Sequence, residues 1–155
     1  MTIFLLRHAE ASFQAARDED RELTARGRRQ LLAVISTNTE ELASVGRIWV
    51  SPYKRAQQTL ALARPYLPDS ATVVTSDLLT PDQNPLGVLP LLEDDRPGDL
   101  MLVGHQPLLG RLLDWLCALE PGAVAMGTSA LAAVDITLVA RGLGHLRWLR
   151  QPQPE

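Results

Sequence analysis

The chain has 155 residues, and its composition, with 46% hydrophobic and 21% charged residues, is that of one globular domain. We expect this domain to span residues 1–150 and to leave residues 151–155 as a frayed polar tail. The net charge of -3 excludes the basic surface of a general nucleic-acid binder. The single cysteine, Cys117, excludes an intramolecular disulfide and a cysteine-based zinc site.

Apolar runs and turn residues predict strands and helices that alternate along the chain. Residues 3–6 predict a first buried strand, and residues 9–21 predict a polar loop. Thr24 can cap a helix that runs to about residue 43, and Gly46 then breaks it. The other predicted elements, in chain order, are a strand at 47–50, a helix from Ser51 and Pro52 to about 67, strands at 71–75 and 99–103, a helix from 107 to about 119, and a hairpin of 131–139 with 145–149.

This alternation predicts an α/β fold, a three-layer sandwich whose central sheet is mostly parallel and covered by helices on both faces. Four prolines punctuate residues 78–97, so we expect at most one short helix there. No apolar run reaches the roughly 18 residues that a membrane helix needs, and the N-terminus lacks the flanks of a signal peptide. We therefore expect a cytoplasmic protein without membrane contact. We also expect a monomer.

Three loops that follow predicted strands carry an unusual set of side chains. The first strand leads into Arg7 and His8, the second into residues 51–59 with Arg55, and the late strand into Gly104 and His105. The carboxyl ends of parallel strands share one edge of a sheet, where ligands bind. We expect these basic side chains to converge there, although histidines after strands also occur for purely structural reasons.

Two guanidinium groups, two imidazoles and a helix N-terminus suit a phosphoryl group, because arginine matches phosphate oxygens in a bidentate fashion. The sequence has no glycine-rich Walker loop, which disfavours P-loop nucleotide hydrolysis. Cys117 has no arginine at the spacing that cysteine phosphatases need, which excludes that class. Histidine is the remaining nucleophile that can form a covalent phosphoryl intermediate.

The three segments resemble the motifs of the histidine phosphatase superfamily, in the same order and spacing. The Arg-His pair of that family is matched by Arg7 and His8, its Ser-Pro-X-X-Arg-Ala-X-Gln-Thr motif by residues 51–59, and its second catalytic histidine by His105. The resemblance implies a phosphoglycerate mutase-like fold without a lid insertion. It also implies a phosphatase that needs neither a metal nor another cofactor.

More narrowly, the sequence is similar to phosphohistidine phosphatases of the SixA type along most of its length. The residues that support this likeness are Asp18, Arg21, Leu23, Thr24, Gly27, Leu79-Thr80-Pro81 and Gly127-Thr128-Ser129-Ala130. The sequence departs from the family pattern at two positions. Ala9 replaces the glycine that commonly follows the Arg-His pair, and Gln106 follows His105 where acid phosphatases carry a proton-donating aspartate. The likeness implies a phosphoprotein substrate, for example a histidine-containing phosphotransfer domain.

By this resemblance, His8 attacks phosphorus while Arg7, Arg55 and His105 hold the equatorial oxygens, and water then hydrolyses the phosphohistidine. The general acid is not evident from the sequence: Glu10, Asp18 and Asp20 lie in the first loop, where solvated carboxylates are the ordinary alternative. An imidazole leaving group needs less help from an acid than an alkoxide does. The missing donor therefore favours a phosphohistidine substrate.

Four further residues are candidates for binding phosphate or substrate: Arg21, Gln106, Ser51 and Asp18. For Arg21, a surface ion pair with Asp18 or Asp20 is an equally good interpretation. Two other functions stay open. One is a small-molecule phosphomonoesterase or mutase of the same superfamily, and the other is a non-catalytic phosphate-binding module, which would not require His8.

Overall fold

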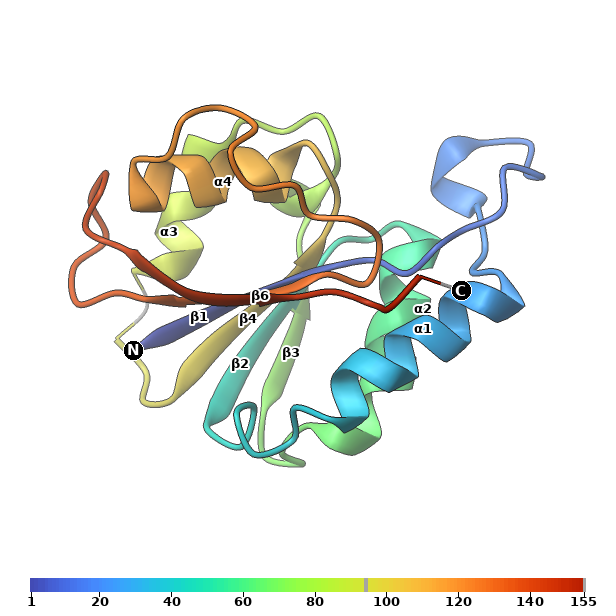
Figure 1. The fold of residues 1–155 in the computed structure, drawn as a ribbon, viewed down its shortest axis with the longest axis horizontal. Helices are drawn as coiled ribbons and strands as arrows, with labels where there is room; N and C mark the ends of the chain where they lie inside the picture. The colour runs from blue at the N-terminus through green and yellow to red at the C-terminus, as the bar shows by residue number, and fades with distance from the viewer. Residues whose placement is uncertain (94, 155) are drawn as a thin grey trace.

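The computed structural model describes residues 1–93 and 95–154, and within them six strands form one sheet in the order β3-β2-β4-β1-β5-β6 (Figure 1). The strands are β1 (Thr2–Arg7), β2 (Val45–Val50), β3 (Thr72–Thr75), β4 (Asp99–Gly104), β5 (Leu131–Asp135) and β6 (His145–Arg150). The α-helices are α1 (Ala25–Ser36), α2 (Lys54–Ala63), α3 (Leu89–Leu92) and α4 (Leu108–Cys117). Short 3-10 turns are η1 (Asp18–Asp20), η2 (Arg64–Tyr66), η3 (Asp77–Leu79) and η4 (Pro85–Val88).

The sheet confirms the predicted fold class. Strands β3, β2, β4 and β1 pair in parallel, and β5 and β6 add an antiparallel edge to β1. Helices α1 and α2 lie on one face of the sheet, and α3 and α4 lie on the other (Figure 1). The chain is therefore a three-layer α/β sandwich.

Strand β1 shows how the sequence produces two cores. Successive side chains of a strand point to opposite faces of its sheet. Phe4 and Leu6 accordingly join the core under α1 and α2, whereas Ile3 and Leu5 join the core under α3 and α4. All four are fully buried, because a parallel central strand is covered on both faces. This buried strand holds the start of the following loop, which carries His8, in a fixed place.

Helix α1 begins as the sequence predicts and packs closely on the loop after β1. The Oγ1 of Thr24 accepts a hydrogen bond from the N–H of Gly27. A Cβ at position 27 would lie 2.3 Å from the carbonyl oxygen of Glu10. Glycine is therefore required there by the close approach of helix and loop.

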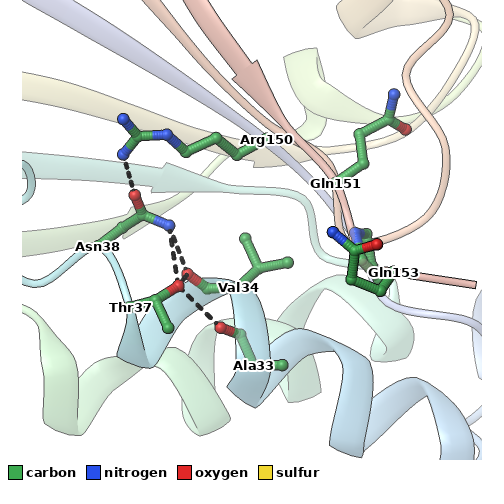
Figure 2. A pocket seen from close by; sticks show the side chains of 8 residues that line it. Ala33, Val34, Thr37, Asn38, Arg150, Gln151 and Gln153 are labelled. Carbon is green, nitrogen blue, oxygen red and sulfur yellow. Dashed lines mark hydrogen bonds between the residues drawn. The ribbon is translucent and has the colours of Figure 1, made fainter.

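The same helix ends at Ser36, seven residues before the predicted end. The hydroxyl of Thr37 donates to the carbonyl of Ala33, and the amide of Asn38 donates to the carbonyl of Val34. These side chains satisfy carbonyls that another helical turn would have used. Asn38 also accepts a hydrogen bond from Arg150, at the end of β6, beside a cavity of about 590 Å³ (Figure 2).

Other predicted boundaries also differ from the structure. Gly46 lies inside β2 at an irregularity of the register with β4, and the strand predicted at 131–139 ends at Asp135. Helix α2 begins at Lys54, so Ser51 is not its cap and Pro52 is not its first residue. The hydroxyl of Ser51 has a different partner, described below.

The C-terminal tail starts from an anchored residue. The side chain of Gln151 accepts a hydrogen bond from the N–H of Gly127 and donates one to the carbonyl of Ala125. The last residue of the predicted tail lies outside the described residues. Among the residues that the structure describes, no helix is both long and apolar enough to cross a membrane.

Candidate active site

The three loops with the basic side chains meet at the carboxyl edge of the sheet, because β2, β4 and β1 are neighbours. The N–H of His8 donates to the carbonyl of Gly104 at 2.9 Å, and the N–H of Ser51 donates to that of Val103 at 3.0 Å. Each loop thus continues the hydrogen bonding of the parallel strands by one residue. The structure brings together His8 and His105 from two of these loops and Arg55 from the start of α2, as the sequence predicts.

Two contacts define the protonation of the His8 ring. Its Nδ1 lies 2.7 Å from the carbonyl oxygen of Ala9, and a carbonyl only accepts, so Nδ1 carries the proton. Its Nε2 lies 3.4 Å from the Nε of Arg55, which only donates, so Nε2 presents a lone pair. His8 is therefore a neutral imidazole whose Nε2 can act as a nucleophile.

The surroundings keep His8 neutral. Burial, and to a smaller extent the charges of Arg55, Arg7 and Arg21, lower its pKa from 6.5 to about 4, against the opposing effect of the Ala9 carbonyl. The pKa of His105 is lowered to about 3, first by burial and then by His8 and Arg55. Both rings are thus uncharged at neutral pH.

These lowered pKa values predict a pH-dependent stability. Between pH 6.5 and about 4, the unfolded chain protonates His8 while the folded chain does not, so stability falls as the pH falls through this window. The limiting slope is about 1.4 kcal/mol per pH unit for each buried histidine. Urea unfolding between pH 7 and pH 5 measures it. A free energy of unfolding that stays constant, or a His8→Gln variant with an unchanged slope, would contradict the prediction.

His105 is held by Ser51. The Nε2 of His105 lies 2.7 Å from the Oγ of Ser51, and both residues are fully buried. The same hydroxyl accepts a hydrogen bond from the N–H of Tyr53. The Tyr53 ring lies 5.0 Å from the His105 ring, which in turn lies 5.1 Å from the ring of His8. Ser51 and Tyr53 therefore set the orientation of His105 toward His8.

We expect Ser51→Ala to lower the free energy of unfolding by about 1–3 kcal/mol, because it leaves the buried His105 nitrogen without its partner. Ser36→Ala, at an exposed position at the end of α1, is the matched control. Denaturant unfolding of the two variants measures the difference. Equal stability of both variants would mean that the contact with His105 contributes nothing.

Arg55 lies between His8 and the loop after β1. It is 4% exposed, and its guanidinium donates to the backbone carbonyl of Asp18 at 2.7 Å and to the Asp18 carboxylate at 3.2 Å. Although partial burial opposes the effect, the hydrogen bond from Arg21 and the charge of Arg55 lower the pKa of Asp18. Asp18 is thus an ionised partner of Arg55 at neutral pH.

Arg7 adds a second guanidinium near the two histidines. Its Nη1 donates to the carbonyl of Met126 at 2.9 Å, and its Nε is buried without a partner among the described residues. Burial and the neighbouring charge of Arg55 lower its pKa. Two cations held close together in a partly desolvated site attract an anion.

The other predicted candidates have partners outside the group of His8, His105, Arg7 and Arg55. Arg21 contacts Asp18 and two backbone carbonyls of the same loop, which agrees with the ion-pair interpretation of its role. Gln106 turns toward α4, where its Oε1 accepts a hydrogen bond from the N–H of Gly110 at 2.7 Å. Glu10 accepts hydrogen bonds from Arg26 and Thr24, and these lower its pKa.

Sequence reasoning assigned no role to Thr59, the last residue of the second motif. Its Oγ1 accepts a hydrogen bond from the N–H of Ala9 and donates to the carbonyl of Arg55. It thereby fixes the His8 loop to α2. The only signal for this role was the fixed place of the threonine within the motif. Tyr53 was likewise missed, although it contacts both His105 and Arg55.

Among the described residues, no group of three histidine, cysteine, aspartate or glutamate side chains could hold a metal ion. The side chains that the structure gathers instead are two neutral imidazoles and two guanidinium groups. This set can bind a tetrahedral anion and attack its central atom.

Known proteins resemble this chain in sequence. Residues 3–79 match the model of the histidine phosphatase superfamily (branch 1). The chain is 29% identical to phosphohistidine phosphatase SixA of Escherichia coli (strain K12), over 98% of this chain and 94% of the relative. It is 30% identical to a phosphohistidine phosphatase SixA homolog of Haemophilus influenzae, over 73% of this chain and 75% of the relative.

Solved structures show the same likeness. The protein histidine phosphatase SixA complexed with tungstate superposes with a TM-score of 0.87 at 29% identity, and the match covers 98% of this chain and 97% of that one. The α/β sandwich and its sheet therefore agree with that structure over nearly the whole length.

Proposed function

The chain belongs to the histidine phosphatase superfamily, and from this we propose that it removes the phosphoryl group from phosphohistidine on a protein, through a phosphorylated His8. The observation that carries the proposal is the neutral His8 ring, whose Nε2 presents its lone pair beside Arg55. The overall identity to phosphohistidine phosphatase SixA supports the substrate class.

In the first step, Nε2 of His8 attacks phosphorus and the phosphorus–nitrogen bond of the substrate breaks. The electron pair of that bond leaves with the substrate imidazole, which departs neutral when its other ring nitrogen already carries a proton. In the second step, water attacks the phosphorylated His8. Inorganic phosphate leaves with the water's oxygen, the excess proton passes to phosphate or solvent, and the Nε2 lone pair is restored.

The cationic groups around His8 stabilise the charge that develops on the phosphoryl oxygens. Arg55 moves its donors from Asp18 and His8 to these oxygens, and Arg7 supplies a second guanidinium. This exchange of partners takes place when the substrate binds, so little further reorganisation accompanies the chemical steps. The hydrogen bond of Nδ1 to the Ala9 carbonyl supports the positive charge that forms on the attacking ring.

The state of the nearby carboxylates favours a phosphorus–nitrogen bond as the one that is cleaved. Arg26 and Thr24 lower the pKa of Glu10, and Arg21 and Arg55 lower that of Asp18. Neither group is a ready proton donor at neutral pH. An alkoxide leaving group needs such a donor, whereas imidazole departs without one.

The SixA relative that was solved with tungstate supports the anion site. Tungstate is a tetrahedral oxyanion, as phosphate is, and we propose that Arg7, Arg55 and His105 hold such an anion here. A non-catalytic phosphate-binding module is the weaker alternative, because anion binding alone does not require the neutral, oriented His8.

A side-by-side kinetic comparison tests the substrate class. We expect kcat/KM for a phosphorylated histidine-containing phosphotransfer domain to exceed that for glucose 6-phosphate or phosphoglycerate by orders of magnitude, at neutral pH in the presence of a chelator. A sugar phosphate that proves the better substrate would replace the proposal by a small-molecule phosphomonoesterase.

The same proposal carries three finer predictions. They are a phosphotransfer domain as the protein substrate, a monomeric enzyme and a cytoplasmic location. The first is tested by the comparison above, the second by light scattering, and the third by fractionation of cells that produce the protein.

A further inference from the structure

One aromatic side chain beside the site is almost fully in water. Phe13 is 85% exposed, the largest exposure among the large hydrophobic residues of the described chain. It lies in residues 12–22, the middle part of the connection between β1 and α1, which stands out beyond the carboxyl edge of the sheet in Figure 1. Burying such a side chain contributes about 1.5–3 kcal/mol of favourable free energy, which the isolated chain does not gain at this position.

The loop that carries Phe13 is held in place rather than loose. At its base, the N–H of Ser12 donates to the carbonyl of Glu22 at 2.8 Å, and Ala11 forms a β-bridge with Leu23. Arg21 closes the loop from within, because its guanidinium donates to the carbonyls of Ser12 and Ala11. A rigid loop presents its side chains to a partner at low entropic cost.

Arg21 also holds the Phe13 ring and connects it to the catalytic cluster. The Arg21 guanidinium lies 4.1 Å from the ring centroid. The same guanidinium donates to Asp18 at 3.2 Å, and Asp18 accepts from Arg55. A continuous series of contacts therefore runs from His8 through Arg55, Asp18 and Arg21 to the exposed ring.

We propose that Phe13 is a docking residue for the phosphoprotein substrate, packing on an apolar surface beside its phosphohistidine. The inference rests on the proposed function. Two side chains, Asp18 and Arg21, separate the ring from Arg55, so a small phosphate compound bound at Arg55 does not reach Phe13. A protein surface that places its phosphohistidine at His8 extends over the loop and covers the ring. Aromatic side chains, phenylalanine included, and arginine are enriched at protein–protein interfaces.

The test compares two substrates in two variants. The substrates are a phosphorylated histidine-containing phosphotransfer domain and free phosphohistidine, and the variants are Phe13→Ala and Leu138→Ala. Leu138 is the matched control, since it is 62% exposed. It follows β5 at the end of the sheet where β1 begins, whereas Phe13 lies beyond the end where β1 finishes. We expect Phe13→Ala to lower kcat/KM for the phosphoprotein, relative to that for free phosphohistidine, about tenfold or more, and Leu138→Ala to leave this ratio unchanged.

Each other outcome overturns the inference. An equal fall for both substrates would mean that Phe13 supports the site rather than docking, and an unchanged ratio would mean that no partner covers it. A change of mass by light scattering with an unchanged ratio would assign the ring to contact between copies of this chain. Failure of the unmodified protein to use the phosphotransfer domain, in contrast, would contradict the proposed function itself.

Discussion

Replacing His8 by alanine should lower kcat for phosphohistidine at least about a thousandfold, because the variant loses the nucleophile on which both chemical steps depend. The His8 ring is oriented for attack on phosphorus. Its Nδ1–H is bound to the Ala9 carbonyl, and its Nε2 presents a lone pair beside Arg55.

His145→Ala is the matched control, since His145 is exposed in β6. We expect it to keep full activity. Steady-state kinetics of both variants, with circular dichroism to check the fold, measure the effect. A folded His8→Ala protein with substantial turnover would show that another group attacks phosphorus.

Replacing Arg55 by alanine should lower kcat/KM at least tenfold, and it should affect catalysis more than folding. Arg55 is 4% exposed, and a hydrogen bond to a charged group in such a position is worth about 1.5–3 kcal/mol. This corresponds to a factor of about ten or more in rate. Arg55→Lys keeps the charge but loses the forked geometry, and we expect it to recover only part of the activity.

Arg141→Ala provides the control for loss of a positive charge. Arg141 is exposed in the β5–β6 connection, which lies at the end of the sheet where β1 begins, whereas His8 follows the other end of β1. We expect its kcat/KM to be that of the unmodified protein. If Arg55→Ala also kept that value, the contact of Arg55 with His8 would have no part in catalysis.

The parts of the structure that the sequence predicts well are those that depend on local pattern. The continuous apolar runs of β1 and β4 predict buried parallel strands, and the order of the loops then predicts that His8 and His105 meet. The end of α1 was not predictable in this way. It depends on capping by Asn38, and Asn38 is itself bound by Arg150, which lies more than a hundred residues later.

The surroundings of the catalytic cluster show the same limit. Ser51 followed by proline is a typical start of a helix, but folding places its hydroxyl on His105. The contact between Asp18 and Arg55 depends on the path of a polar loop, for which apolar periodicity gives no information. Motif residues could therefore be identified, whereas the partners that orient them required the three-dimensional structure.

The most direct test of the account is to follow the phosphoryl group itself. A phosphotransfer domain that carries a radioactive label on its phosphohistidine is mixed with excess protein, quenched rapidly in base, and digested. We expect a transient label on the peptide that contains His8, stable in base and lost in acid. Label on a serine, on Cys117 or on a carboxylate, or release of phosphate without transient label on the protein, would contradict it.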